Sequence, residues 1–342
     1  MSNNVFDIHR VENININIVV NKPNLKRLPL KVIQDDDISI VCSPAHKKTA
    51  INSPSLTCSE KINEKKQSSP EIKSIQSVGN YEYSKNITDY KIDLEVSLIH
   101  LKGILSKHDI PSRLRARMVD WMVEVMSIFS KNLESLFCSV HIMDRHLESC
   151  TKKLCGDDIH LIGIVSMMMA SKLMDKLPIE MEDAIIYIGR EKFNASQIKE
   201  LQIQMCQNLN WNLWAPTVLE EIRVMVSQME QILVNGSKEE VKLRLILDAI
   251  LVNAQRSALI GIYDSNFIQE FQSEKIAEAC IITGMIKVHK VMAHHASSII
   301  KWEKWFKGRC NVNDKIISEL GRIEKKMIDL GLQNYEKYNF VQ

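Results

Sequence analysis

Glycine and proline are scarce in this chain, with 11 glycines and 8 prolines in 342 residues, about half the usual share. Residues that form tight turns and sheet edges are therefore few, which argues against a β-rich fold. The longest uncharged apolar run, residues 159–171, has 13 residues, whereas a bilayer-spanning helix needs about 20. The composition predicts an all-α protein without a membrane-spanning segment.

Features of secreted proteins, metalloproteins and enzymes are also missing. The eight cysteines are too scattered for a disulfide framework, and the first ten residues lack the basic and apolar segments of a secretory signal. One cluster with conceivable zinc-ligand spacing lacks a C-x-x-C pair: His146, Cys150, Cys155 and His160. Without a phosphate-binding glycine loop or a nucleophile turn, we expect a soluble intracellular protein that is not an enzyme and has no metal and no cofactor.

Residues 1–85 differ from the rest. They contain 12 basic and 9 acidic residues, and Phe6 is the one aromatic residue among the first eighty. Such a segment cannot bury enough apolar surface to offset its loss of conformational entropy, so a disordered tail is expected. The remaining 32 basic and 33 acidic residues give residues 86–342 a net charge of −1, which argues against nucleic-acid binding.

From residue 87 onward, apolar residues recur with helical spacing. A helix is expected to start near residue 88, and two further sets of five follow: 113–129, 134–149, 158–174, 180–188 and 195–209, then 217–232, 239–258, 266–270, 273–292 and 295–306. Each set has one helix with small residues at its middle: Gly163, Ser166, Ala170 and Ser171, then Ala277, Ala279, Thr283 and Gly284. Small residues let helices approach closely, so each is expected at the centre of a five-helix unit.

The helix over 113–129 carries one narrow polar stripe, made of Arg113, Arg117, Asp120, Glu124 and Ser127. Most of its remaining surface is apolar, which predicts a helix buried on most sides. A strip beside the polar stripe is expected to reach the surface: Leu114, Met118, Trp121 and Val125.

Several segments resemble, in order and spacing, the cyclin box of A/B-type mitotic cyclins: 114–125, 143–147, 170–172 and 211–217, with 273–279 in the second set. The resemblance covers residues 88 to 335. It implies tandem five-helix cyclin-box units preceded by an N-terminal helix and a disordered tail. The expected boundaries are 1–85 for the tail, 86–210 and 211–335 for the two boxes, and 336–342 for a C-terminal tail.

The resemblance also assigns roles to residues. Arg115 and Asp144 are expected to form a buried ion pair, because an unpaired charge in an apolar helix is costly. Contacts to a kinase are implied for Tyr90, Asp93, Leu94, Lys172 and Gln202. Gln202 stands where the family has Glu, so the charge-assisted part of that contact is lost.

A surface patch for docking substrates is implied for Leu114, Arg117, Met118, Trp121, Glu124 and His160. An acidic residue beside an indole suits a basic, apolar peptide. However, Arg117 stands where the family has an aliphatic residue, and His160 where it has Gln. The fixed charge of Arg117 is expected to repel basic docking peptides, which either changes the docking preference or removes it.

In the tail, the segment 27–35 resembles a destruction box, with Arg27, Leu30, Ile33 and Asp35 at its key positions. It implies recognition by a ubiquitin ligase of the anaphase-promoting type. Three Ser-Pro pairs, at Ser43, Ser53 and Ser69, are minimal sites for proline-directed kinases, and phosphates there would add negative charge to an unfolded segment.

The resemblance therefore implies a regulatory subunit that binds and activates a cyclin-dependent protein kinase at G2/M or in mitosis, in the nucleus and cytoplasm. Neither a nucleic acid nor a membrane is an expected partner. One alternative is a cyclin-like scaffold without kinase activation, for which Arg117, Met174 and Gln202 are the warning signs. A more distant alternative is a transcription-initiation factor of the same fold, which would need a basic face.

Overall fold

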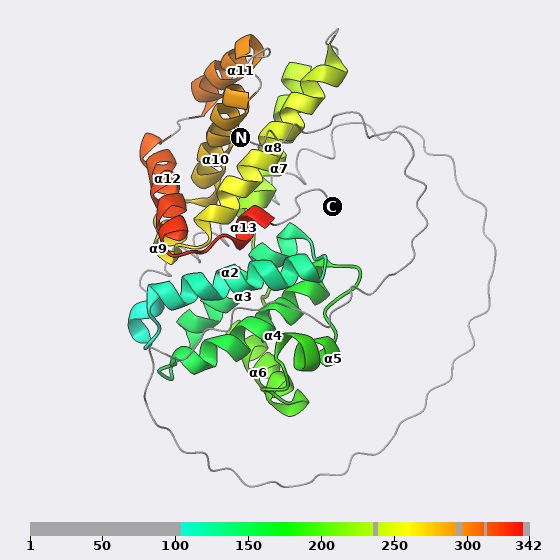
Figure 1. Ribbon diagram of the computed structural model, residues 1–342, viewed down its shortest axis with the longest axis vertical. Coiled ribbons are helices and arrows are strands. Elements are labelled where there is room, and N and C mark those ends of the chain that lie inside the picture. Colours follow the sequence, from blue (N-terminus) through cyan, green and yellow to red (C-terminus); the bar gives the residue numbers. More distant parts are fainter. Residues whose placement is uncertain (1–103, 235–238, 292–295, 311–312, 338–342) are drawn as a thin grey trace, which may run out of the picture. The chain divides into compact units, whose positions relative to one another are not determined.

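The computed structural model describes residues 104–234, 239–291, 296–310 and 313–337. Every regular element in these ranges is helical (Figure 1), as the composition predicts. No helix in this part of the chain combines the length and apolar character needed to cross a membrane. The tail expected over 1–85 and the helix expected from residue 88 lie outside the described residues.

The first group of helices packs around α4 (Gly156–Met174), as its small residues predict. A Cβ atom added at Gly163 would lie 2.7 Å from Cε of Met118, so the Met118 side chain of α2 packs against this glycine. The other elements of this group are η1 (Ile104–Lys107), α2 (Ser112–Ile128), α3 (Leu133–Ser149), α5 (Met181–Asp183), η2 (Ala184–Ile188) and α6 (Ala195–Asn208).

The second group packs around α10 (Ser273–Val291), which contacts α7, α8, α11 and α12. A Cβ atom at Gly284 would lie 2.7 Å from the carbonyl oxygen of Ile250 on α8. The elements of this group before α12 are α7 (Val218–Met229), η3 (Glu230–Val234), α8 (Glu240–Gly261), α9 (Ser265–Glu270) and α11 (Ala296–Arg309). The domain boundary expected between residues 210 and 211 stays a prediction.

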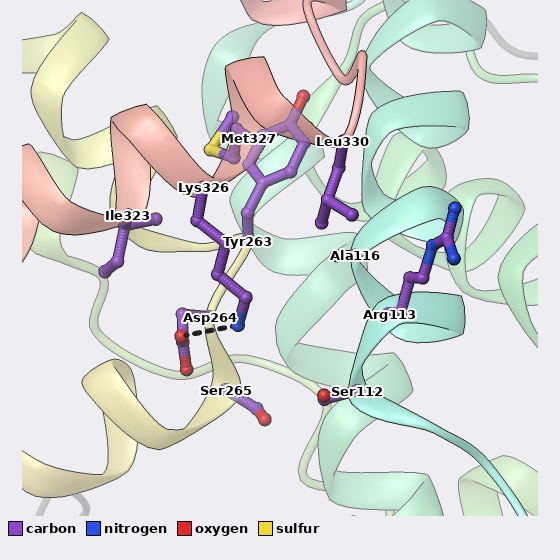
Figure 2. Close-up of a pocket in the computed structure, with 10 residues that line it drawn as sticks. All are labelled: Ser112, Arg113, Ala116, Tyr263, Asp264, Ser265, Ile323, Lys326, Met327 and Leu330. Atoms are coloured by element: carbon purple, nitrogen blue, oxygen red, sulfur yellow. Dashed lines mark ion pairs between the residues drawn. The ribbon is translucent and has the colours of Figure 1, made fainter.

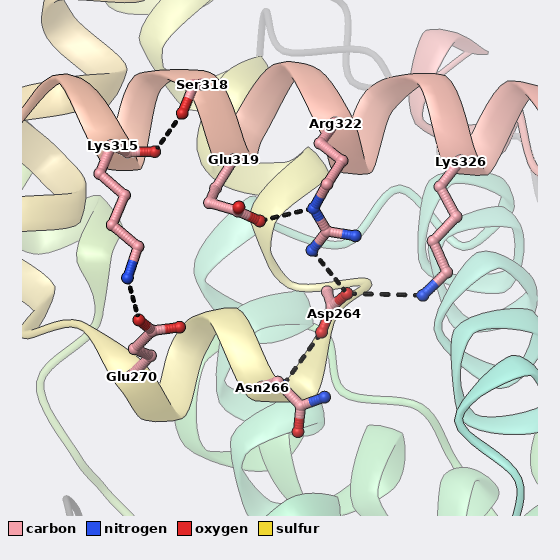
Figure 3. A network of polar contacts seen from close by, with 8 residues as sticks. All are labelled: Asp264, Asn266, Glu270, Lys315, Ser318, Glu319, Arg322 and Lys326. Atoms are coloured by element: carbon pink, nitrogen blue, oxygen red, sulfur yellow. Dashed lines mark hydrogen bonds and ion pairs between the residues drawn. The ribbon is translucent and has the colours of Figure 1, made fainter.

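Two helices near the end of the chain were not among those expected, namely α12 (Asp314–Asp329) and the short α13 (Asn334–Lys337). The buried face of α12 repeats at helical spacing: Ile316, Leu320, Ile323 and Met327. Its polar face forms ion pairs with α9 and with Asp264, the residue that precedes α9 (Figure 3). Lys315 pairs with Glu270 at 2.6 Å, and Asp264 forms ion pairs with Arg322 at 3.8 Å and with Lys326 at 3.6 Å.

We predict that Gly284→Ala lowers the free energy of unfolding by about 1–3 kcal/mol, because its methyl group meets backbone atoms of α8 that cannot move aside cheaply. The matched control is Gly321→Ala in α12, where nothing lies within 4 Å of the added Cβ. That change is expected to stabilise by about 0.5–1 kcal/mol, since alanine favours the helix. Denaturant unfolding of both variants measures the difference, and equal effects would contradict the close contact between α8 and α10.

Candidate functional site

Arg115 and Asp144 form the predicted ion pair between α2 and α3. The Arg115 side chain is 1% exposed, and its Nε and Nη2 atoms donate to the two carboxylate oxygens of Asp144 at 2.8 and 2.6 Å. Nη1 also donates to the carbonyl oxygens of Ile262 at 3.0 Å and Tyr263 at 3.2 Å, which follow α8. One guanidinium therefore joins the two groups of helices, and its donors are used on both sides.

Asp120 was expected on the polar stripe of α2, and the structure shows instead that it is buried. Its Oδ1 accepts from the Tyr263 hydroxyl at 2.9 Å and from the Asn334 backbone N–H at 3.0 Å. Burial and the nearby carboxylate raise the pKa of Tyr263 well above its ordinary value, so the phenol stays a donor. The stripe is interrupted because the second helix group and α13 cover Asp120.

Lys172 lies in the last turn of α4, next to α6, and its side chain is exposed. Burial raises the pKa of the Cys206 thiol on α6, and the positive charge of the Lys172 ammonium opposes that shift. Gln202 lies one turn before Cys206 and is half-buried. The structure thus brings two of the expected kinase contacts to neighbouring helices, whereas Tyr90, Asp93 and Leu94 lie outside the described residues.

Apolar side chains surround Lys172 in the sequence and on the adjoining helix. Leu173 and Leu177 follow it, Ile203 follows Gln202, and all three are exposed, Leu177 by 69%. We call Lys172, Leu173, Leu177, Gln202 and Ile203 the α4–α6 edge. Exposed leucine and isoleucine side chains beside a cation are suited to a partner that is mainly apolar.

A set of hydrogen bonds, which the sequence did not reveal, holds the loop after α4. The buried Lys131 ammonium donates to the carbonyl oxygen of Leu177. Asp175 accepts from the Asn132 backbone N–H at 3.0 Å and from the Ser135 hydroxyl at 2.8 Å. Burial lowers the pKa of Lys131, and Asp175 and Asp183 oppose that effect. We call Lys131 and Asp175 the loop clamp, because they fix the segment that carries Leu177.

Four of the six residues of the predicted docking patch line one side of α2. Leu114, Arg117, Trp121 and Glu124 are half-buried and follow one another at spacings of 3, 4 and 3 on α2, so they form one ridge, the α2 ridge. Met118 does not belong to it. It is 1% exposed because its side chain packs against Gly163 of α4, so its assignment to a surface patch was wrong.

Two rings extend the ridge beyond α2. The Trp121 and His160 rings meet edge to face with centroids 4.8 Å apart, and His160 meets Phe193 in the same way at 5.5 Å. Burial, aided by Lys192, lowers the pKa of His160 to about 4, so the ring is neutral near pH 7. Phe193 was not among the predicted site residues, since it precedes α6 and has no periodic pattern around it.

No group of three or more metal-ligating side chains occurs in the ranges that the structure describes. Nε2 of His146 lies 3.4 Å from Sγ of Cys150, while His160 packs against Trp121. A hollow of about 20 Å³ lies between the start of α2 and the end of α12. Among its lining residues, Lys326 pairs with Asp264 at 3.6 Å (Figure 2). That volume suits a water molecule.

The residues assigned to regulation in the tail lie outside the described part of the chain. They are Arg27, Leu30, Ile33 and Asp35 of the destruction-box segment and the serines Ser43, Ser53 and Ser69. Their roles stay predictions.

Arg115→Met is expected to lower the free energy of unfolding by about 3–5 kcal/mol, because it leaves Asp144 as a buried charge without its partner. The control is Lys153→Met, which breaks an exposed pair with Asp109 (2.7 Å) and should cost under about 1 kcal/mol. Adding Asp144→Leu to Arg115→Met should recover part of the loss. If Arg115→Met stays within about 1 kcal/mol of the wild type in denaturant unfolding, the pair is not the junction that we describe.

His160 makes stability depend on pH. The unfolded chain protonates this ring below its ordinary pKa of 6.5, whereas the folded chain does so only near 4. The stability that His160 contributes is therefore complete above pH 6.5 and is lost as pH falls toward 4. Between pH 7 and 4.5 the wild type should lose about 1–2 kcal/mol relative to His160→Gln, after allowance for the partly exposed ring. Urea unfolding of both proteins across this range measures the difference between their free energies of unfolding. That difference should not change with pH if the His160 ring is not shielded from solvent.

In comparisons with known proteins, residues 86–214 match the family model described as "Cyclin, N-terminal domain". G2/mitotic-specific cyclin-B2 of Mesocricetus auratus is 33% identical over 142 residues, which cover 42% of this chain and 35% of that protein. Cyclin-A2 of Xenopus laevis is 30% identical over 140 residues, or 41% of this chain and 33% of its own. The alignments thus span about a third of the length of these curated relatives.

Among solved structures, a viral cyclin from herpesvirus saimiri aligns with 69% of this chain and 96% of its own, at 13% identity and a TM-score of 0.49. The family match covers the ion pair, the α2 ridge and the α4–α6 edge. Residues 86–214 are thus similar to the cyclin N-terminal domain, and the B-type and A-type cyclins resemble this chain over that part of its length.

Proposed function

We propose that this chain is a regulatory subunit of a cyclin-dependent protein kinase, which it binds through the α4–α6 edge and activates without being an enzyme itself. The observation that carries the proposal is this edge, where exposed Leu173, Leu177 and Ile203 stand beside Lys172 within the matched cyclin domain. Several relatives are described as G2/mitotic-specific cyclins, which supports a role in cell division at G2/M.

Binding would draw its free energy from burial of the exposed apolar side chains, while the charge of Lys172 would fix the orientation of the partner. Full burial of one exposed leucine or isoleucine contributes about 1.5–3 kcal/mol, so three such side chains can supply much of the binding free energy. The loop clamp holds Leu177 before the partner arrives, which reduces the entropy lost on binding. Lys172 contributes to the orientation and specificity of binding more than to affinity, because its single ammonium group must meet an acceptor at one position.

Activation would follow from a shift in population. The kinase has inactive and active arrangements, and the active one makes the ion pair between its ATP-binding lysine and a helix glutamate. A subunit that binds the active arrangement more tightly raises its population by the ratio of the two affinities. The residues of the α4–α6 edge are the ones that would contact that kinase helix.

The second candidate function is a cyclin-like scaffold that binds a kinase without activating it. Gln202 favours it, because an uncharged side chain beside Lys172 gives up the stronger hydrogen bond of a carboxylate. Met174, half-buried at the end of α4, likewise offers no charge where the family usually has Glu. The two candidates differ in one readout, which is stimulation of the kinase.

Regulation through the tail is part of the proposal. The segment 27–35 would direct the chain to a ubiquitin ligase of the anaphase-promoting type, and Ser43, Ser53 and Ser69 would receive phosphate. Both roles need an extended, accessible segment, which the composition of residues 1–85 favours. A presence in both nucleus and cytoplasm fits a protein that acts in dividing cells.

The full chain is expected to stimulate histone phosphorylation by a monomeric cyclin-dependent kinase at least tenfold, and Lys172→Glu should remove most of that stimulation. Lys304→Glu, the same charge reversal at an exposed site on α11, serves as the control and should leave it intact. Tight binding of the wild type without stimulation would favour the scaffold. Absence of both binding and stimulation with every such kinase of the same cell would rule out the proposal.

A further inference from the structure

Positive charges that the fold does not neutralise lie on the α2 ridge and beside it. In the described part of the chain, the Arg117 guanidinium takes part in no ion pair or hydrogen bond. Arg113, one turn earlier, is exposed and points away from the Asp264–Lys326 pair (Figure 2). Two arginines four residues apart on a helix repel each other, and the first turn of α2 holds no acidic residue to offset them.

The acidic side chains of the same helix are engaged within the fold. Asp120 is buried and accepts from Tyr263 and Asn334. Glu124, at the far end of the ridge, accepts from Nδ2 of Asn334 at 3.4 Å. The half of the ridge around Arg117 is therefore positive, whereas the carboxylate at its other end is already in contact with a donor from α13.

Apolar surface adjoins these charges. Leu114 lies one turn before Arg117 and Trp121 one turn after it, and the indole continues into the ring contacts with His160 and Phe193. Lys192 lies 5.6 Å from the centroid of the Phe193 ring and adds a further cation at this border. A ligand on this surface meets apolar rings and unpaired cations together.

We propose that the α2 ridge binds an extended, acidic and apolar peptide segment, in which a carboxylate pairs with Arg117 and a leucine or aromatic side chain covers Trp121. This proposal rests on the proposed function, since it names the class of docking partner for that regulatory subunit. A basic docking peptide is disfavoured, because it places like charges together at Arg113 and Arg117.

Helix geometry sets the spacing of the two peptide residues. Arg117 and Trp121 are four residues apart on α2, about 6 Å along the helix axis. An extended peptide advances about 3.3 Å per residue and presents alternate side chains to one side. The carboxylate and the apolar side chain are therefore two residues apart, in the pattern acidic-x-apolar. The planar guanidinium can hold a carboxylate through two parallel hydrogen bonds.

The test is fluorescence anisotropy of the full chain with three labelled nine-residue peptides that differ only in one position, Glu-x-Leu, Gln-x-Leu or Lys-x-Leu. The wild type is expected to bind the Glu peptide at least tenfold more tightly than the Lys peptide, with the Gln peptide between them. Arg117→Glu should invert this order and Arg117→Gln should bring the three affinities together. The matched control Lys304→Glu should keep the wild-type order.

A wild type that binds the Lys peptide as tightly as the Glu peptide would overturn the proposal, as would an order that Arg117→Glu leaves unchanged. Self-association that Arg117→Glu abolishes, without any peptide preference, would assign the ridge to a second copy and also overturn it. These assays contain no kinase. Stimulation measured on a substrate without an acidic-x-apolar segment tests the proposed function separately, so failure of one is distinguishable from failure of the other.

Discussion

The Arg115 guanidinium is the interaction on which the arrangement of this fold depends. A charge held at 1% exposure is tolerated only when its donors are satisfied, and Arg115 satisfies them with Asp144 on α3 and two carbonyl groups after α8. Because those carbonyls belong to the second group of helices, the same contact sets how α2 meets that group. The Tyr263 hydroxyl and Asn334 add neutral donors to Asp120, five residues further along α2.

This inner side of α2 determines what remains on its outer side. Asp120 and Glu124 are drawn toward Tyr263 and Asn334, so the carboxylates of the helix are occupied within the protein. Arg117 faces outward beside Trp121 without a partner among the described residues. The positive charge available to a docking peptide is thus a consequence of how the two helix groups are joined. In the α4–α6 edge, contacts within the fold likewise determine what is exposed, because the loop clamp holds the segment that carries Leu177.

Much of the fold follows from the sequence because it depends on local patterns. The small residues of α4 and α10 predicted both central helices, and the backbone contact at Gly284 shows why a larger residue is disfavoured there. The helix α12 was also predictable, since Ile316, Leu320, Ile323 and Met327 recur at helical spacing. The expected helices end at residue 306, although the family resemblance extends to residue 335.

The parts of the site that were missed depend on contacts between residues distant in the sequence. The polar stripe gave no sign that Asp120 is buried, because its partners Tyr263 and Asn334 lie 143 and 214 residues later. Met118 shared the spacing of the ridge, and only the approach of α4 decides that it is buried. Lys131 and Asp175 lie in connecting segments without periodicity, so no pattern linked them.

Hydrogen exchange of the full chain, with and without a monomeric cyclin-dependent kinase, tests the central claim most directly. The account predicts slower exchange at the end of α4, the loop that carries Leu177 and the segment of α6 around Gln202. Exchange in α11 and α12 should stay the same. Protection confined to the second group of helices, or no protection at kinase concentrations that saturate binding, would contradict it.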